Sequence, residues 1–113
     1  MIFITGPMFS GKRTFAKALF GWSDEELQAN AILDAQDLVK NEDNLEALAA
    51  RLSARPVVIA SEVGGGVVPL NKEERTNREK AGRLACLLAA RADTVVRLCC
   101  GIPEVLKGEL TCR

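Results

Sequence analysis

Short apolar runs alternate with stretches of helical periodicity along this chain. Met1–Thr5 is a brief run rich in β-branched and aromatic residues that stops at a glycine, as expected for a buried parallel strand. Between Gly11 and Gly21 the apolar positions fall at helical spacing instead, and the second glycine is placed to end the helix. The chain therefore opens as strand, glycine-containing loop and helix.

The alternation continues to the end of the chain. Ser23 followed three residues later by Glu26 is the pattern of a capping box, which predicts a short helix through Leu27. The brief apolar run after it ends on Asp34. The remaining predicted elements are a helix over about 43–53, a buried strand over 57–60, a long helix over about 71–91 and a strand over 94–100 that Gly101-Ile102-Pro103 ends.

Strands that are apolar on both faces and separated by helices predict an α/β fold with a mainly parallel sheet of about four strands. A length of 113 residues is that of a single domain, so residues 1–113 are interpreted as one unit. With right-handed crossovers, the loops after the first three strands lie along the carboxyl edge of the sheet, where ligands of open α/β sheets bind. We therefore expect Lys12, Asp34 and Glu62 to converge.

The chain carries 15 basic and 15 acidic residues and is formally neutral, which argues against a nucleic-acid partner or an anionic membrane surface. No segment approaches the roughly 18 consecutive apolar residues that span a bilayer, and the apolar start has no basic leader or cleavage site. The expected location is cytoplasmic. The four cysteines lack zinc-site spacing, and Cys99 and Cys100 sit in an apolar run, which favours buried thiols in a reducing compartment.

The stretch from Gly6 to Thr14, GPMFSGKRT, has the Gly-x4-Gly-Lys frame of a phosphate-binding loop between a strand and a helix. Such loops work because successive backbone N–H groups point into a concavity, and the helix that follows presents its positive end. A structural turn with a solvated lysine is the alternative. The residues expected to bind the phosphates of a nucleotide are Gly6, Pro7, Ser10, Gly11, Lys12, Arg13 and Thr14.

Arg13 stands where these loops place the serine or threonine that holds magnesium. A guanidinium carries only donors and cannot ligate a cation. Thr14 is a poor replacement, because one residue further turns a side chain by about 100° around the helix axis. Either Arg13 neutralises phosphate charge and lowers the dependence on metal, or it faces solvent and the site has weakened.

Two carboxylates are candidates for catalysis beside Lys12. Asp34, at the end of a short apolar strand, is expected to hold Mg²⁺ through water, unless it is only a turn or capping residue. Glu62 is expected to polarise an acceptor hydroxyl or contact a second ligand, unless it is a solvated loop carboxylate. The chain contains no histidine, which removes histidine-based acid/base catalysis, the serine–histidine triad and histidine metal ligation together.

From Glu62 onward the sequence resembles the adenosylcobinamide kinase and adenosylcobinamide-phosphate guanylyltransferase family of cobalamin biosynthesis. Residues 62–69 match that family's Glu-Val-Gly-x-Gly-x-Val-Pro loop, Ser10-Gly11-Lys12 resembles its phosphate loop, and residues 32–34 resemble its acidic strand end. Further matching positions are Asn71, Arg75, Arg78, Ala81-Gly82-Arg83, Leu88-Ala89-Ala90, Ala92-Asp93 and Val95. The resemblance covers about two thirds of the chain and is strongest from Val57 to Gly101.

The resemblance implies a phosphate-loop fold, ATP or GTP with Mg²⁺ as cofactors, cobinamide as a partner, and a homo-oligomer, a trimer in that family. Family members phosphorylate the aminopropanol hydroxyl of cobinamide and then transfer a guanylyl group through a histidine. This chain lacks that histidine, and the region between its first helix and the acidic strand is nearly gone. The leading interpretation is therefore a cobinamide kinase-like phosphotransferase without guanylyltransferase activity. The alternative is a shortened, non-catalytic paralogue that binds nucleotide as a regulatory or assembly module.

Overall fold

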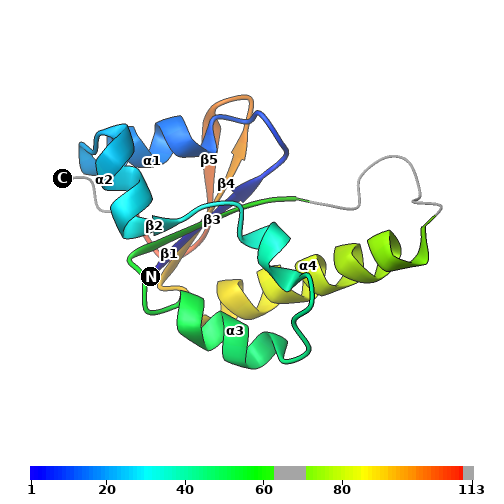
Figure 1. Cartoon of the computed structure of the whole chain (residues 1–113). Coiled ribbons are helices and arrows are strands. Elements are labelled where there is room, and N and C mark those ends of the chain that lie inside the picture. Colours follow the sequence, from blue (N-terminus) through cyan, green and yellow to red (C-terminus); the bar gives the residue numbers. More distant parts are fainter. Residues whose placement is uncertain (63–70, 111–113) are drawn as a thin grey trace.

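The computed structural model describes residues 1–62 and 71–110, and within them five strands form one mixed sheet (Figure 1). The strand order is β2-β3-β1-β4-β5; the first four run parallel to their neighbours and β5 is antiparallel to β4. The strands are β1 Ile2–Gly6, β2 Ala31–Ile32, β3 Val57–Ser61, β4 Thr94–Cys99 and β5 Ile102–Lys107. The predicted α/β fold with a mainly parallel sheet is confirmed.

Helices cover both faces of the sheet, α1 and α2 on one side and α3 and α4 on the other (Figure 1). They are α1 Lys12–Phe20, α2 Asp24–Asn30, the 3₁₀ helix η1 Ala35–Val39, α3 Leu45–Leu52 and α4 Lys72–Arg91. Gly21 ends α1 with φ 69°, and the capping box of Ser23 and Glu26 begins α2, as the sequence predicts. The long helix α4 begins on Asn71, whose side chain accepts hydrogen bonds from the first turn.

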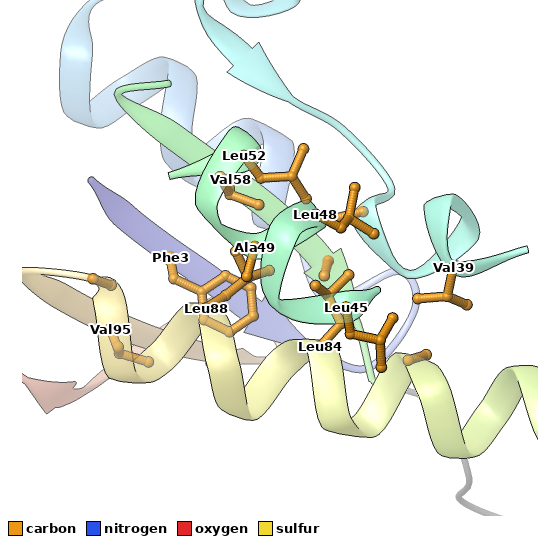
Figure 2. Close-up of a cluster of buried hydrophobic side chains, with 14 residues drawn as sticks. Phe3, Val39, Leu45, Leu48, Ala49, Leu52, Val58, Leu84, Leu88 and Val95 are labelled. Atoms are coloured by element: carbon orange, nitrogen blue, oxygen red, sulfur yellow. The ribbon is translucent and has the colours of Figure 1, made fainter. Parts of the chain in front are cut away.

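Successive residues of β1 point to opposite faces of the sheet and into two separate cores. Phe3 is 2% exposed and packs in the core beneath α3 and α4, with Leu84 and Leu88 (Figure 2). Ile4 is fully buried in the other core, with Ala16 of α1. Because the central strands β1, β3 and β4 bury residues on both faces, the carboxyl edge of the sheet is left as the place where polar side chains gather.

The fifth strand was not predicted, because Gly101-Ile102-Pro103 indicated the end of the last strand. Instead, Cys100 and Gly101 form a two-residue turn with φ values of 53° and 76°, and Cys99 pairs with Ile102. Positive φ at both central positions is the geometry of a tight hairpin. All six residues of β5 are exposed, so the strand has no buried pattern to predict it, and proline is tolerated on such an edge.

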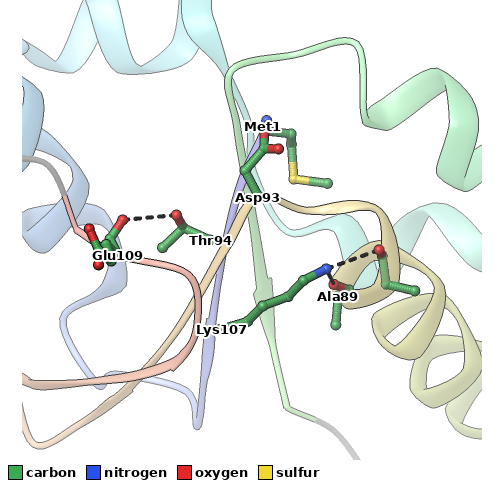
Figure 3. Close-up of polar contacts among 7 residues, drawn as sticks. Met1, Ala89, Asp93, Thr94, Lys107 and Glu109 are labelled. Atoms are coloured by element: carbon green, nitrogen blue, oxygen red, sulfur yellow. Dashed lines mark hydrogen bonds and ion pairs between the residues drawn. The ribbon is translucent and has the colours of Figure 1, made fainter.

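Polar contacts hold β5 against the rest of the molecule (Figure 3). Lys107 Nζ donates to the carbonyl oxygens of Ala89 and Ala90 at 3.1 and 3.0 Å, in the last turn of α4. A cation suits this position, because the last carbonyls of a helix are unpaired and carry its negative end. Thr94 Oγ1 donates to the Glu109 carbonyl at 3.0 Å, which secures the chain just after β5.

The cysteines are not buried, and the expectation of core thiols was wrong for the three that the structure describes. Cys86 lies on the exposed face of α4, Cys99 ends β4, and Cys100 is in the hairpin turn. The apolar run predicted burial, but it ends at the sheet edge rather than within the core. Cys112 lies outside the described residues. None of the described helices is both long enough and apolar enough to cross a membrane.

Candidate phosphate-binding site

The loop between β1 and α1 depends on glycine at its first position. Gly6 has φ 148°, and a Cβ on this residue would lie 2.3 Å from the carbonyl oxygen of Leu98 in β4. Its own carbonyl accepts a hydrogen bond from Glu62 N at 2.8 Å. Gly6 therefore sits between the two strands that flank β1, and the chain can turn out of the sheet here only because no side chain is present.

The far end of the loop is attached to the β4–β5 hairpin. Gly101 N donates to the Ser10 carbonyl at 2.9 Å, and Gly11 takes a left-handed conformation, φ 88°, as the N-cap of α1. The first intrahelical bond follows at once, from Phe15 N to the Gly11 carbonyl. The β4–β5 hairpin, which the sequence did not predict, thus supports the predicted phosphate loop.

Lys12 is the first residue of α1 and is only 7% exposed. Its ammonium donates to the Pro7 carbonyl at 2.8 Å and lies 3.5 Å from Ser10 Oγ, so it is held across the loop. Burial lowers the pKa of Lys12; the nearby carboxylates of Asp34 and Glu62 act against that shift, and Arg13 adds to it. A desolvated cation at the positive end of a helix is suited to an anion.

A cavity of about 370 Å³ opens at the carboxyl ends of β1 and β3. Its size is that of a small-molecule site. The helices that follow these two strands, α1 and α4, lie on opposite faces of the sheet (Figure 1), so the cavity is at the point where the chain's winding reverses. It is lined by Met8, Phe9, Ser10, Gly11, Lys12, Arg13, Thr14, Asp34, Ile59 and Ser61.

Arg13 and Asp34 form an ion pair in this cavity. Arg13 Nη2 lies 2.6 Å from Asp34 Oδ2, and the two side chains are 54% and 44% exposed. Asp34 has φ 53° and ψ 48°, a left-handed conformation that is uncommon for a residue with a side chain, and its carboxylate accepts no capping hydrogen bond from η1. The carboxylate is instead directed to the guanidinium of Arg13.

Glu62 is also paired with an arginine. Arg97 of β4 donates to both carboxylate oxygens, from Nε to Oε1 at 2.6 Å and from Nη2 to Oε2 at 3.4 Å. This pairing raises the pKa of Arg97, first through the hydrogen bond and then through the charge of Glu62. The pair crosses the end of β1, because β3 and β4 lie on either side of it.

The predicted site residues meet at one edge of the sheet. Lys12 and Asp34 share the cavity, while Glu62 lies beside it and acts on Lys12 through its charge. The sequence reasoning missed Arg97, whose one signal was a charge inside an otherwise apolar strand. The catalytic and binding roles remain predictions, and the rest of the glycine-rich loop, residues 63–70, lies outside the described residues.

Magnesium does not fit the side chains found here. Phosphate-loop enzymes hold it with a loop hydroxyl and an acidic residue, but Arg13 occupies the hydroxyl position and also binds Asp34. Among residues 1–62 and 71–110, no three His, Cys, Asp or Glu side chains are grouped so that they could hold a metal ion. The expected metal role of Asp34 therefore stays a prediction that this geometry does not favour.

Comparison with known proteins relates the chain to corrinoid metabolism. A family model described as cobinamide kinase / cobinamide phosphate guanyltransferase matches residues 21–106. The bifunctional adenosylcobalamin biosynthesis protein CobP of Pseudomonas aeruginosa is 34% identical over 76 residues, which are 67% of this chain and 44% of that protein. The chain thus matches less than half the length of this relative. Because the family match begins after α1, the assignment of the phosphate loop depends on its own sequence and geometry.

Proposed function

Because this chain belongs to the cobinamide kinase / cobinamide phosphate guanyltransferase family, we propose that it binds ATP or GTP at residues 6–14 and transfers the γ-phosphoryl group to the hydroxyl of adenosylcobinamide. One observation carries the proposal: Lys12 is buried, its ammonium is held across the glycine loop that precedes α1, and the residue lines the cavity. The choice of acceptor follows from family membership, and the choice of phosphate site follows from the loop.

In this proposal, Lys12 and the backbone amides of the loop stabilise the negative charge on the transferring group. The acceptor hydroxyl oxygen attacks the γ-phosphorus, the bond to the bridging oxygen breaks, and the nucleoside diphosphate leaves. Phosphoryl transfer depends mainly on positioning and on electrostatic stabilisation, so a fixed cation and a row of N–H donors are the parts that it requires.

Glu62 is proposed to contact the acceptor. Its carboxylate is oriented by Arg97 and lies beside the cavity rather than in its wall. A carboxylate held in this way keeps lone pairs that can accept the proton of an incoming hydroxyl. Asp34 is assigned to the nucleotide side, because it lines the cavity with Lys12.

We do not propose guanylyl transfer for these 113 residues. They contain no histidine, and no other side chain is an evident substitute for an imidazole that becomes guanylylated. The non-catalytic alternative, a module that binds nucleotide and does not turn it over, is favoured by one observation. Arg13 stands at the position of the usual hydroxyl and is paired with Asp34.

The test is to incubate the purified protein with ATP or GTP labelled at the γ-phosphate and with adenosylcobinamide, in buffers with and without magnesium. Labelled adenosylcobinamide phosphate supports the kinase, and bound but intact nucleotide supports the module. The Lys12→Ala variant should lose the activity, whereas Lys17→Ala, in the same helix but paired with Asp24 at 2.6 Å, should keep it. No binding of either nucleotide would reject both forms of the proposal.

A further inference from the structure

The cavity holds an arginine at the position from which a phosphate loop normally holds its metal. Arg13 is the second residue of α1 and lines the cavity beside Lys12. Its guanidinium offers five N–H donors and no lone pair, so it can bind phosphate oxygens but not a cation. A magnesium ion at this position would meet a positive charge rather than a ligand.

The carboxylate that would complete a metal site serves Arg13 instead. Asp34 Oδ2 lies 2.6 Å from Arg13 Nη2, and Asp34 reaches this place by adopting a left-handed backbone conformation. Such a conformation carries a cost that the surrounding structure must offset. The contact with Asp34 engages one of the two Nη atoms of the guanidinium, and Arg13 also lines the cavity.

We propose that the Arg13–Asp34 pair takes the place of the divalent cation, so that this protein binds a nucleoside triphosphate in its metal-free form. The inference rests on the proposed function, because it concerns the same phosphate site. Arg13 supplies charge next to Lys12 at the positive end of α1, and Asp34 is a positioning residue that fixes the guanidinium. Charge-assisted hydrogen bonds from arginine to phosphate can be bidentate, so the side chain can orient the phosphates as well as neutralise them.

The exposure of the pair is consistent with a ligand-facing role. The two side chains are 54% and 44% exposed, although the ion pair between them is short. A surface ion pair of this kind contributes little to stability. Replacing Arg13 should therefore leave the fold intact, so that binding can be measured on folded variants.

The experiment titrates the non-hydrolysable imido analogues of ATP and GTP into the protein by calorimetry, once with EDTA and once with excess magnesium. For the unmodified protein, the Kd should differ by less than about threefold between the two buffers. For Arg13→Ser, the affinity in EDTA should fall by about 10- to 100-fold, the loss expected for charged hydrogen bonds, and magnesium should restore about tenfold or more.

Two further variants act as controls. Lys17→Ser removes the same charge from the same helix, but Lys17 is paired with Asp24 outside the cavity, so neither Kd should change. Asp34→Asn should weaken binding in EDTA by a smaller factor, about three- to tenfold, because Arg13 loses its positioning partner but keeps its charge. Circular dichroism melting checks that each variant is folded.

The outcomes separate this inference from the proposed function. Binding that is at least tenfold tighter with magnesium in the unmodified protein, and unchanged by Arg13→Ser, would overturn the inference and leave the nucleotide site standing. Failure to bind in both buffers would overturn both. Metal-free binding that depends on Arg13 supports the inference whether or not the protein turns the nucleotide over.

Discussion

Two arginine–carboxylate pairs flank the end of β1, and they differ in how they are built. The Arg97–Glu62 pair joins a residue of β4 to the first residue after β3, across the end of β1, and it uses both carboxylate oxygens. The Arg13–Asp34 pair joins the first turn of a helix to a residue in a left-handed conformation, through one contact. Only the second pair lines the cavity.

This difference bears on the roles that we propose for the two pairs. A bidentate pair anchored on the two strands that flank β1 is held rigidly, which suits a carboxylate that must keep one direction. A single contact from an arginine with further free donors suits a group that also binds a ligand. The difference supports our proposal that the Arg13–Asp34 pair binds the nucleotide phosphates and that Glu62, held by Arg97, contacts the acceptor.

The largest expected effect comes from Gly6→Ala. Gly6 starts the loop that leads to Arg13, and its carbonyl accepts the hydrogen bond from Glu62 N, so the substitution should disturb both pairs. A methyl group would lie 2.3 Å from the Leu98 carbonyl, and alanine would have to adopt φ 148°. Strain and overpacking together should lower the free energy of unfolding by about 3 kcal/mol or more, measured by urea denaturation. Gly82→Ala is the control: this exposed position in α4 has open space around it, and the variant should gain about 0.5–1 kcal/mol. Equal effects of the two substitutions would contradict the account of the loop.

Local patterns allowed much of this fold to be predicted. The strand–loop–helix at the start, the capping box at Ser23 and the edge at which Lys12, Asp34 and Glu62 meet all follow from periodicity, turn chemistry and the handedness of crossovers. These rules act over a few residues, or apply to any parallel sheet, and they hold here.

The parts that escaped prediction depend on partners far apart in the chain. Arg13 and Asp34 are 21 residues apart in sequence, and Arg97 and Glu62 are 35 residues apart, so no local pattern predicts either pair. The strand β5 lacks a buried face, and the proline at its second position indicates the end of a strand rather than a new one. The strand forms because Cys100 and Gly101 both adopt positive φ in the turn before it. The apolar run that precedes the turn gave no sign of this conformation.

The next largest effect concerns the acceptor side of the comparison. Glu62→Gln should slow phosphoryl transfer to adenosylcobinamide by about 100-fold, the usual contribution of a positioned acid/base group, with little change in nucleotide Kd. The matched variant Asp34→Asn should do the reverse and weaken nucleotide binding without magnesium. Steady-state transfer rates and calorimetric Kd values for the two variants check this. Parallel changes in both quantities would mean that the two carboxylates do not divide the work.

A smaller effect is expected on stability, to which the two ion pairs should contribute similar coupling energies. Double-mutant cycles with alanine at Arg13 and Asp34, and at Arg97 and Glu62, should each give a coupling energy below about 1 kcal/mol, because all four side chains are partly exposed. Repeating both cycles with nucleotide bound should raise only the coupling of the cavity pair. A large coupling for the cavity pair in the absence of nucleotide would make that pair structural.

The finest distinction between the two carboxylates is their influence on Lys12. Burial lowers the pKa of Lys12 from its ordinary value of 10.5, and Asp34 counteracts this more strongly than Glu62. Asp34→Asn should therefore lower the pKa of Lys12 further than Glu62→Gln does, as measured by NMR titration of the Lys12 side chain. The same result for both variants would remove the electrostatic difference between the pairs.

The two variants should also differ in how the free energy of unfolding depends on pH. Because folded Lys12 releases its proton below 10.5, the unfolded chain binds more protons in that window, and stability rises as pH increases through it. The rise should begin at a lower pH in Asp34→Asn than in Glu62→Gln, and it should be absent in Lys12→Met, which has no proton to release. Urea denaturation at a series of pH values approaching 10.5 from below measures this difference. The cause is that Lys12 is desolvated in the folded state and hydrated in the unfolded chain.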